Sequence, residues 1–161
     1  MDTLTYYKNI YADIYFNIAQ IYKLKGDLAN SVLNYNDALK LDNSSSKIKK
    51  ELAAVLSDIG FRNYNEGKIY NAISYLAQSL KLFSEDDNAY NNLGVAYYGQ
   101  GKFDEAIDQY QKSIKQNSKN VNAWNNIGMV SEKKVNIAGG KTYYKKACEL
   151  GMQSTCNLLK D

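Results

Sequence analysis

A six-residue motif of this chain returns after 34 residues, and that interval limits the folds available to the sequence. AYNNLG at 89–94 is followed by AWNNIG at 123–128, and an Ile-Gly pair stands one interval earlier at 59–60. The same spacing links Gly67 to Gly101. Self-similarity at a period of roughly 20 to 50 residues is typical of stacked repeat arrays. Such arrays act through a continuous surface rather than through a catalytic pocket.

The stretch 87–120 predicts two antiparallel helices joined by a tight turn. Its first half spaces small and apolar residues three and four positions apart, as on one helical face, at Tyr90, Leu93, Gly94 and Tyr97. Gly101 follows, and glycine is suited to end a helix in the left-handed conformation. The second half repeats the helical spacing at Phe103, Ala106, Ile107, Tyr110 and Ile114.

This pattern of apolar face, small residue and glycine turn resembles the tetratricopeptide repeat. Four units fit, at residues 12–45, 53–86, 87–120 and 121–154. The small residue of the family, where the paired helices approach closely, falls on Ala19, Gly60, Gly94 and Gly128. Its turn glycine falls on Gly26, Gly67 and Gly101, whereas the fourth unit has Val135. The resemblance implies an all-α fold, a right-handed α-solenoid of four helical pairs.

Three departures from the family pattern carry structural predictions. Residues 46–52 are an insertion between the first two units, and two extra helical turns preserve the apolar face. We therefore expect the first helix of unit two to begin near Ser45 or Ser46, and that of unit one near Thr3. In unit four, Asn136 to Gly140 replaces the usual turn, which predicts the least regular pair. A short helix at 154–161 is expected to cap the apolar face of that pair.

The composition argues against several classes of function. The chain has no histidine, which is the commonest general base and metal ligand. We find no phosphate-binding glycine loop, metal-ligand cluster or nucleophile motif, so we expect neither an enzyme nor a cofactor. A net charge of +3 and a single arginine, Arg62, make nucleic acid a poor partner, and RNA-binding helical repeats have a different period. No apolar run is long enough for insertion into a membrane.

In a stack of helical pairs the first helices line the inner wall, and their residues that point away from the second helix are free to touch a ligand. These candidate groove residues are Asn17, Gln20, Lys23, Asp58, Phe61, Tyr64, Asn92, Val95, Tyr98, Asn126, Met129 and Lys133. One place per unit is taken by the series Asn17, Asp58, Asn92 and Asn126, here called the asparagine row.

An amide both donates and accepts, so the asparagine row could pair with the backbone of an extended peptide. Superhelical members of the family that bind peptides use such a row; the aspartate here could only accept. The alternative is that these asparagines only solvate an exposed helix face. Chaperone-binding members carry a basic clamp for a terminal carboxylate, but the equivalent places hold Phe16, Ser57, Asn91 and Asn125.

Cys148 and Cys156 are a second candidate site, in a segment that resembles the Sel1-like branch of the same superfamily. Cysteine-rich members of that branch bridge one helix end to the next helix start with this spacing, which implies a disulfide. The alternative is that Cys148 is a small core residue. We expect a cytoplasmic protein by default, since no signal peptide is visible, and a periplasmic or secreted one if the cysteines are bridged.

These observations predict a protein–protein interaction scaffold, an adaptor that holds a peptide or a helix of a partner in its concave groove. The alternative is a structural or assembly module that self-associates, or a fragment of a larger protein.

Overall fold

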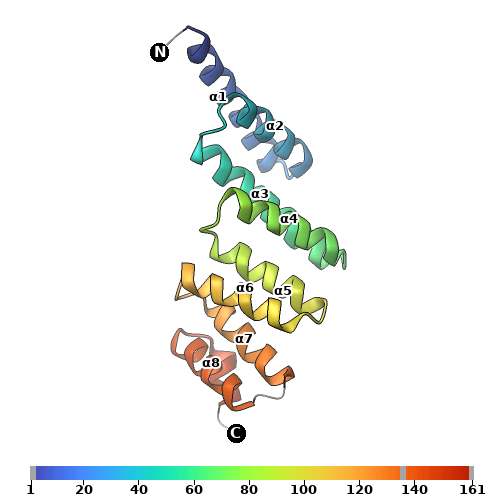
Figure 1. The fold of residues 1–161 in the computed structure, drawn as a ribbon, viewed down its shortest axis with the longest axis vertical. Helices are drawn as coiled ribbons and strands as arrows, with labels where there is room; N and C mark the ends of the chain where they lie inside the picture. The colour runs from blue at the N-terminus through green and yellow to red at the C-terminus, as the bar shows by residue number, and fades with distance from the viewer. Residues whose placement is uncertain (1–2, 135–136, 160–161) are drawn as a thin grey trace.

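Four antiparallel helical pairs and a short final helix make up the residues that the computed structural model describes, 3–134 and 137–159 (Figure 1). The pairs are α1 (Thr3–Leu24) with α2 (Leu28–Leu41), α3 (Ser46–Asn65) with α4 (Ile69–Leu82), α5 (Asp87–Gly99) with α6 (Phe103–Gln116), and α7 (Val121–Lys133) with α8 (Ile137–Glu149); α9 (Gln153–Leu158) follows. They are stacked in chain order, with α1 and α8 at opposite ends (Figure 1). The all-α solenoid expected from the sequence is confirmed.

Polar residues just before the helices fix where several of them begin. The side chain of Ser45 accepts a hydrogen bond from the Ile48 backbone N–H, so α3 begins at Ser46 as predicted. Asp86 and Asn120 cap α5 and α7 in the same way. The predicted start of α1 at Thr3 is also confirmed. The last helix begins one residue before the predicted Ser154, and residues 160 and 161 lie outside the described part.

The turns inside the first three pairs share one conformation. Gly26, Gly67 and Gly101 have φ values of 77°, 75° and 74°, in the left-handed region that other residues rarely adopt. The N–H of Gly67 donates to the carbonyl of Tyr64, and that of Gly101 to the carbonyl of Tyr98. This shared turn sets the same antiparallel return in each of these three pairs. Val135 and Asn136, at the turn of the fourth unit, lie outside the described residues.

Each pair closes over a small residue of its first helix. A Cβ atom placed on Gly94 would lie 2.5 Å from Cε1 of Tyr110, and one on Gly128 would lie 2.5 Å from Cε1 of Tyr144. At Gly60 the nearest atom would be Cγ of Leu76, at 2.7 Å. The repeated small residues therefore let a bulky side chain of the second helix lie directly on the backbone of the first.

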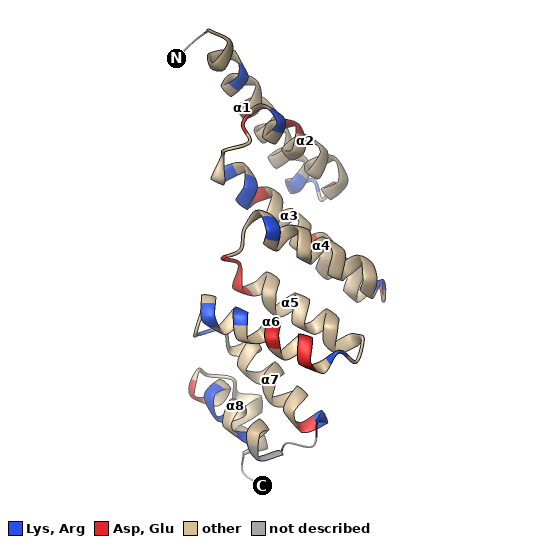
Figure 2. Ribbon diagram, in the orientation of Figure 1, with Lys and Arg blue, Asp and Glu red and all other residues tan. Residues whose placement is uncertain are grey.

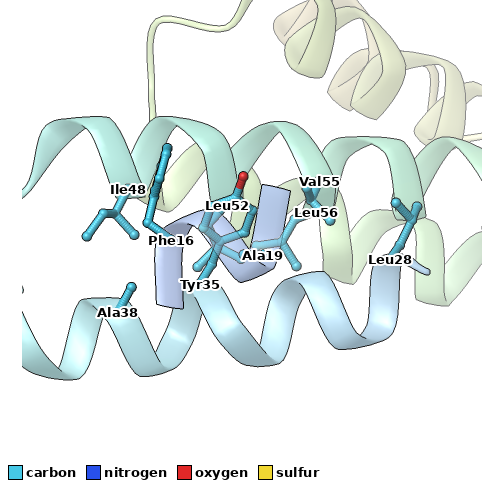
Figure 3. Close-up of a cluster of buried hydrophobic side chains, with 9 residues drawn as sticks. All are labelled: Phe16, Ala19, Leu28, Tyr35, Ala38, Ile48, Leu52, Val55 and Leu56. Atoms are coloured by element: carbon cyan, nitrogen blue, oxygen red, sulfur yellow. The ribbon is translucent and has the colours of Figure 1, made fainter. Parts of the chain in front are cut away.

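The apolar core is divided along the stack into clusters that join one pair to the next. The first cluster brings α1, α2 and α3 together, and Figure 3 shows its side chains converging between these helices. In it the rings of Phe16 and Tyr35 meet edge to face, with centroids 5.6 Å apart. Two further clusters lie mainly between α4 and α5 and between α6 and α7. Within the described residues, no helix combines the length and apolar character needed to cross a membrane.

Three tyrosines of the second helices are buried, and burial changes how they titrate. It raises the pKa of Tyr35 to about 12, with a smaller contribution from the Glu51 carboxylate. Burial also raises the pKa of Tyr110. For Tyr144, burial and then a hydrogen bond to the Glu132 carboxylate raise the pKa. In each case the folded protein favours the neutral phenol.

The domain should therefore lose stability in alkali. These tyrosines have folded pKa values above the ordinary value of about 10 in the unfolded chain, so their contribution is complete below about pH 10 and is lost as the pH rises toward 12. Denaturant unfolding followed by circular dichroism at several pH values would measure this loss. Tyr35→Phe should reduce it and cost little at neutral pH, because the Tyr35 hydroxyl has no hydrogen-bond partner within the described residues. An unfolding free energy that stays constant across this range would contradict the expectation.

Candidate binding groove

The first helices of the last three pairs lie next to one another and share a cleft. Besides packing on their own partners, α3 contacts α5 and α5 contacts α7. Between them lies a cleft of about 480 Å³. Its walls are Asp58, Phe61 and Tyr64 of α3, Leu76 of α4, Asn88, Asn91, Asn92 and Val95 of α5, and Asn122 and Asn126 of α7.

The cleft holds six of the candidate groove residues, namely Asp58, Phe61, Tyr64, Asn92, Val95 and Asn126. The sequence reasoning named Asn91 only as a clamp position, and it missed Asn88 and Asn122, which also line the cleft. Asn88 and Asn122 stand one helical turn before Asn92 and Asn126, and they are themselves separated by the 34-residue period. That spacing was the signal that could have found them, because residues four apart lie on one helical face.

One hydrogen bond joins the walls of the cleft across two repeats. The Asn126 side-chain N–H donates to the side-chain oxygen of Asn91, 3.0 Å away, and so ties α7 to α5. Asn91 itself is buried. The amide of Asn92, in contrast, has no hydrogen-bond partner among the described residues and is half-buried at the cleft wall. Members of the asparagine row are therefore not equivalent: Asn92 is available to a ligand, and Asn126 is already engaged.

The cleft is polar and almost without charge. Among the described residues that line it, only Asp58 is charged, and five are asparagines. Beyond Asp87 at its start, α5 carries no charged residue, as its ribbon in Figure 2 shows. Such a surface offers many donors and acceptors to a ligand but little long-range attraction.

A smaller cavity of about 160 Å³ adjoins the cleft and is lined mainly by apolar and aromatic groups. It shares Tyr64, Val95 and Asn126 with the cleft and adds Tyr98, Tyr110 and Met129. Tyr98 and Met129 also face a third hollow, whose other walls are Glu132 and Lys133. Three further candidates, Tyr98, Met129 and Lys133, thus line hollows that continue from the cleft along α5 and α7.

The candidates on α1 lie outside this cleft. Asn17 is exposed and Gln20 is half-buried. The Lys23 ammonium forms an ion pair with the Glu51 carboxylate, 3.0 Å away, which links α1 to α3. Lys23 is thus engaged within the array.

The two cysteines join the last two helices. Cys148 near the end of α8 and Cys156 in α9 form a disulfide, and the chain turns between them at Gly151, whose φ is 103°. The described residues include no free cysteine. They also include no group of three or more Cys, Asp or Glu side chains that could hold a metal ion.

Comparisons with known proteins agree on the fold. The match of the sequence to models of the tetratricopeptide repeat covers residues 12–45, 88–120 and 121–150. A search of curated proteins finds no match.

Several solved structures are similar to the chain. YrrB, described as a TPR protein with an unusual peptide-binding site, has a TM-score of 0.64 and 19% identity over 91% of this chain and 90% of its own. MamA has a TM-score of 0.63 and 23% identity over 90% and 81%. The first TPR domain of Spaghetti (RPAP3), solved with an HSP90 peptide, has a TM-score of 0.65 and 20% identity over 69% and 90%.

At sequence identities of 19% to 23%, the similarity to these solved structures is evidence for the fold alone. The family models account for three stretches that together span more than half of the chain. The remaining pair, α3 with α4, has the same glycine turn at Gly67 and the same close contact at Gly60. On this evidence the chain belongs to the tetratricopeptide repeat family.

Proposed function

We propose that the chain is a protein-interaction module that holds an extended segment of a partner protein in the cleft between α3, α5 and α7. One observation carries the proposal: five asparagine side chains from two consecutive repeats converge on a cleft that is nearly free of charge. An extended backbone presents alternating donors and acceptors, and a primary amide can satisfy both. The chain has no catalytic role in this proposal, since arrays of this kind are typically non-catalytic binding surfaces.

Aromatic groups beside the amides supply places for apolar anchors. Phe61 is an exposed aromatic ring at the α3 wall. The small cavity at Tyr64, Tyr98 and Met129 suits one apolar side chain of a ligand. Backbone pairing would then tolerate many sequences, and one or two anchor residues would select among them.

Two of the similar structures support a peptide as the class of ligand. One contains an HSP90 peptide, and the other is described as having an unusual peptide-binding site. Capture of a terminal carboxylate by a basic clamp is not part of the proposal, because Phe16, Ser57, Asn91 and Asn125 occupy the clamp positions. Asn91, moreover, is held by Asn126.

Selection of peptides from a random library would test the proposal. Peptides of about twelve residues span roughly 40 Å when extended, long enough to cross all three helices. The affinity of a selected peptide should fall about tenfold or more in the double variant Asn88→Ala/Asn92→Ala, because each lost hydrogen bond costs about 1 kcal/mol. Calorimetric titration would measure it.

The matched control is Asn71→Ala, which removes an exposed amide from the outer helix α4. It should leave the affinity unchanged, and both variants should melt like the original chain. Raising the salt concentration should change the affinity only slightly, because Asp58 is the one charged side chain among the described residues that line the cleft. Normal binding by the double variant, together with loss of binding in outer-helix variants, would move the site to the convex face.

A second function, self-association of the array, is favoured by one observation. A long apolar face of α1 is exposed within the described structure.

A further inference from the structure

The first helix carries an apolar stripe that the described part of the chain leaves largely uncovered. Leu4, Tyr7, Tyr11, Ile14 and Ile21 are 66%, 53%, 55%, 45% and 52% exposed. With the half-buried Ile18 between the last two, they follow one another at alternating steps of three and four residues, so they lie along one side of the helix. Another side of α1, with Ala12, Phe16 and Ala19, is buried in the array.

The same face is buried in the next repeat. The units at 12–45 and 53–86 are offset by 41 residues, so Tyr7, Tyr11 and Ile14 correspond to Ile48, Leu52 and Val55 of α3. Those three residues are 5%, 2% and 0% exposed, because α1 and α2 pack against them. The stripe on α1 is thus a packing surface of the kind that the array buries between its repeats.

We propose that a second copy of this chain covers the stripe, with the two α1 helices packed antiparallel across a two-fold axis. This proposal rests on self-association, the second function proposed above, and identifies the interface for it. It does not depend on peptide binding in the cleft. The support lies in the pairing of side chains that the symmetry of the stripe allows. Counted from Ile21 back to Leu4, the intervals between successive residues of the stripe are again three, four, three, four and three. An interface between identical surfaces requires such self-complementarity.

The antiparallel register pairs residues of compatible chemistry. Leu4 of one copy lies level with Ile21 of the second copy, and Tyr7 lies level with Ile18. Tyr11 lies level with Ile14 near the axis, so both tyrosines of the stripe meet a branched aliphatic side chain.

The charged residues of this segment also fit the register. The charged residues between Leu4 and Ile21 are Lys8 and Asp13. In this register Lys8 lies level with Asn17 of the second copy, and Asp13 lies level with Ala12. No like charges oppose one another, so nothing in the stripe disfavours a second copy.

The surface is large enough for a specific but modest dimer. Five large side chains that are about half exposed present on the order of 500 Å² per copy, so two copies would bury about 1,000 Å², near the lower limit for specific interfaces. Such an area suits a reversible dimer rather than a permanent one.

Sedimentation equilibrium of the full chain tests the proposal. At about 50 µM, where a dimer of micromolar affinity is largely formed, the mass should approach twice the 18.2 kDa of one chain. Tyr11→Lys and Ile14→Glu should each weaken the dimer about 100-fold or more and leave mainly monomers at this concentration, because each places two charges against apolar side chains near the axis.

An equimolar mixture of the two variants should recover the dimer. In the mixed pair the introduced lysine lies level with the introduced glutamate, and the other contact near the axis is still Tyr11 with Ile14. Leu33→Glu, which changes an exposed leucine of α2 outside the stripe, should remain dimeric. The cleft variant Asn88→Ala/Asn92→Ala should also remain dimeric. The test of the dimer interface is therefore separate from the test of peptide binding in the cleft. Circular dichroism of every variant checks that it is folded.

Three outcomes would overturn the proposal. The original chain could be monomeric or larger than a dimer. The single variants could remain dimeric, which would place the interface elsewhere. The mixture could stay monomeric, which would exclude the antiparallel register.

Discussion

Replacing Gly94 with leucine should lower the free energy of unfolding by about 3 kcal/mol, because overfilling a packed contact forces strain into the surrounding side chains and backbone. Even the first carbon of the new side chain would lie 2.5 Å from the ring of Tyr110. The ring cannot simply move away, since Tyr110 is 2% exposed and packed among α6 and α7 residues. Denaturant unfolding followed by circular dichroism would measure the loss.

Two smaller changes serve as controls for Gly94→Leu. Gly94→Ala should cost less than Gly94→Leu but should still destabilise, because its Cβ also meets the Tyr110 ring at 2.5 Å. The helix propensity of alanine, up to about 1 kcal/mol better than that of glycine, offsets part of this cost. The first pair has Ala19 at the equivalent position, in the same cluster as Tyr35. Asn92→Ala, two residues away, should change stability by at most about 0.5 kcal/mol, because its amide loses no hydrogen bond to any described residue. If Asn92→Ala unfolded the domain and Gly94→Leu did not, the faces of α5 would be the reverse of those described.

Reducing the bond between Cys148 and Cys156 should have the next largest effect on stability. The two residues are separated by 8 positions, and closing so short a loop contributes at most about 2–3 kcal/mol on the chain-entropy model. The loss should appear mainly in α9, because its six residues include one buried side chain, that of Thr155. Thermal unfolding with and without reductant, together with thiol titration, would measure both effects.

The double variant Cys148→Ser/Cys156→Ser is the control for reduction. It should melt at the temperature of the reduced chain and should no longer respond to reductant. Two thiols titrating in protein kept under oxidising conditions would contradict the bridge.

The sequence was sufficient to predict the helices and their pairing because those features are encoded locally. Ser45 caps the helix that follows it, and Gly67 and Gly101 allow the turn within a few residues of where it is needed. The close contacts at Gly94 and Gly128 were also predictable, since the 34-residue period aligns them.

Contacts between repeats were harder to predict. The bond from Asn126 to Asn91 depends on the rise and rotation from α5 to α7, which the period alone does not specify. The ion pair of Lys23 depends on Glu51, which lies in the insertion at 46–52 that lengthens α3. Sequence reasoning therefore placed Lys23 and Asn126 on the groove face but could not show that each already has a partner.

The division of the core into clusters between neighbouring helices has a consequence for motion. Within the described residues the clusters link each pair to the next, and none of them joins α1 to α7. In arrays of this kind stability is a sum over repeats and the contacts between neighbours, so one end can open while the other stays folded. Amide hydrogens of α1 can thus exchange with solvent through openings that leave α5 and α7, two of the three helices that form the cleft, intact.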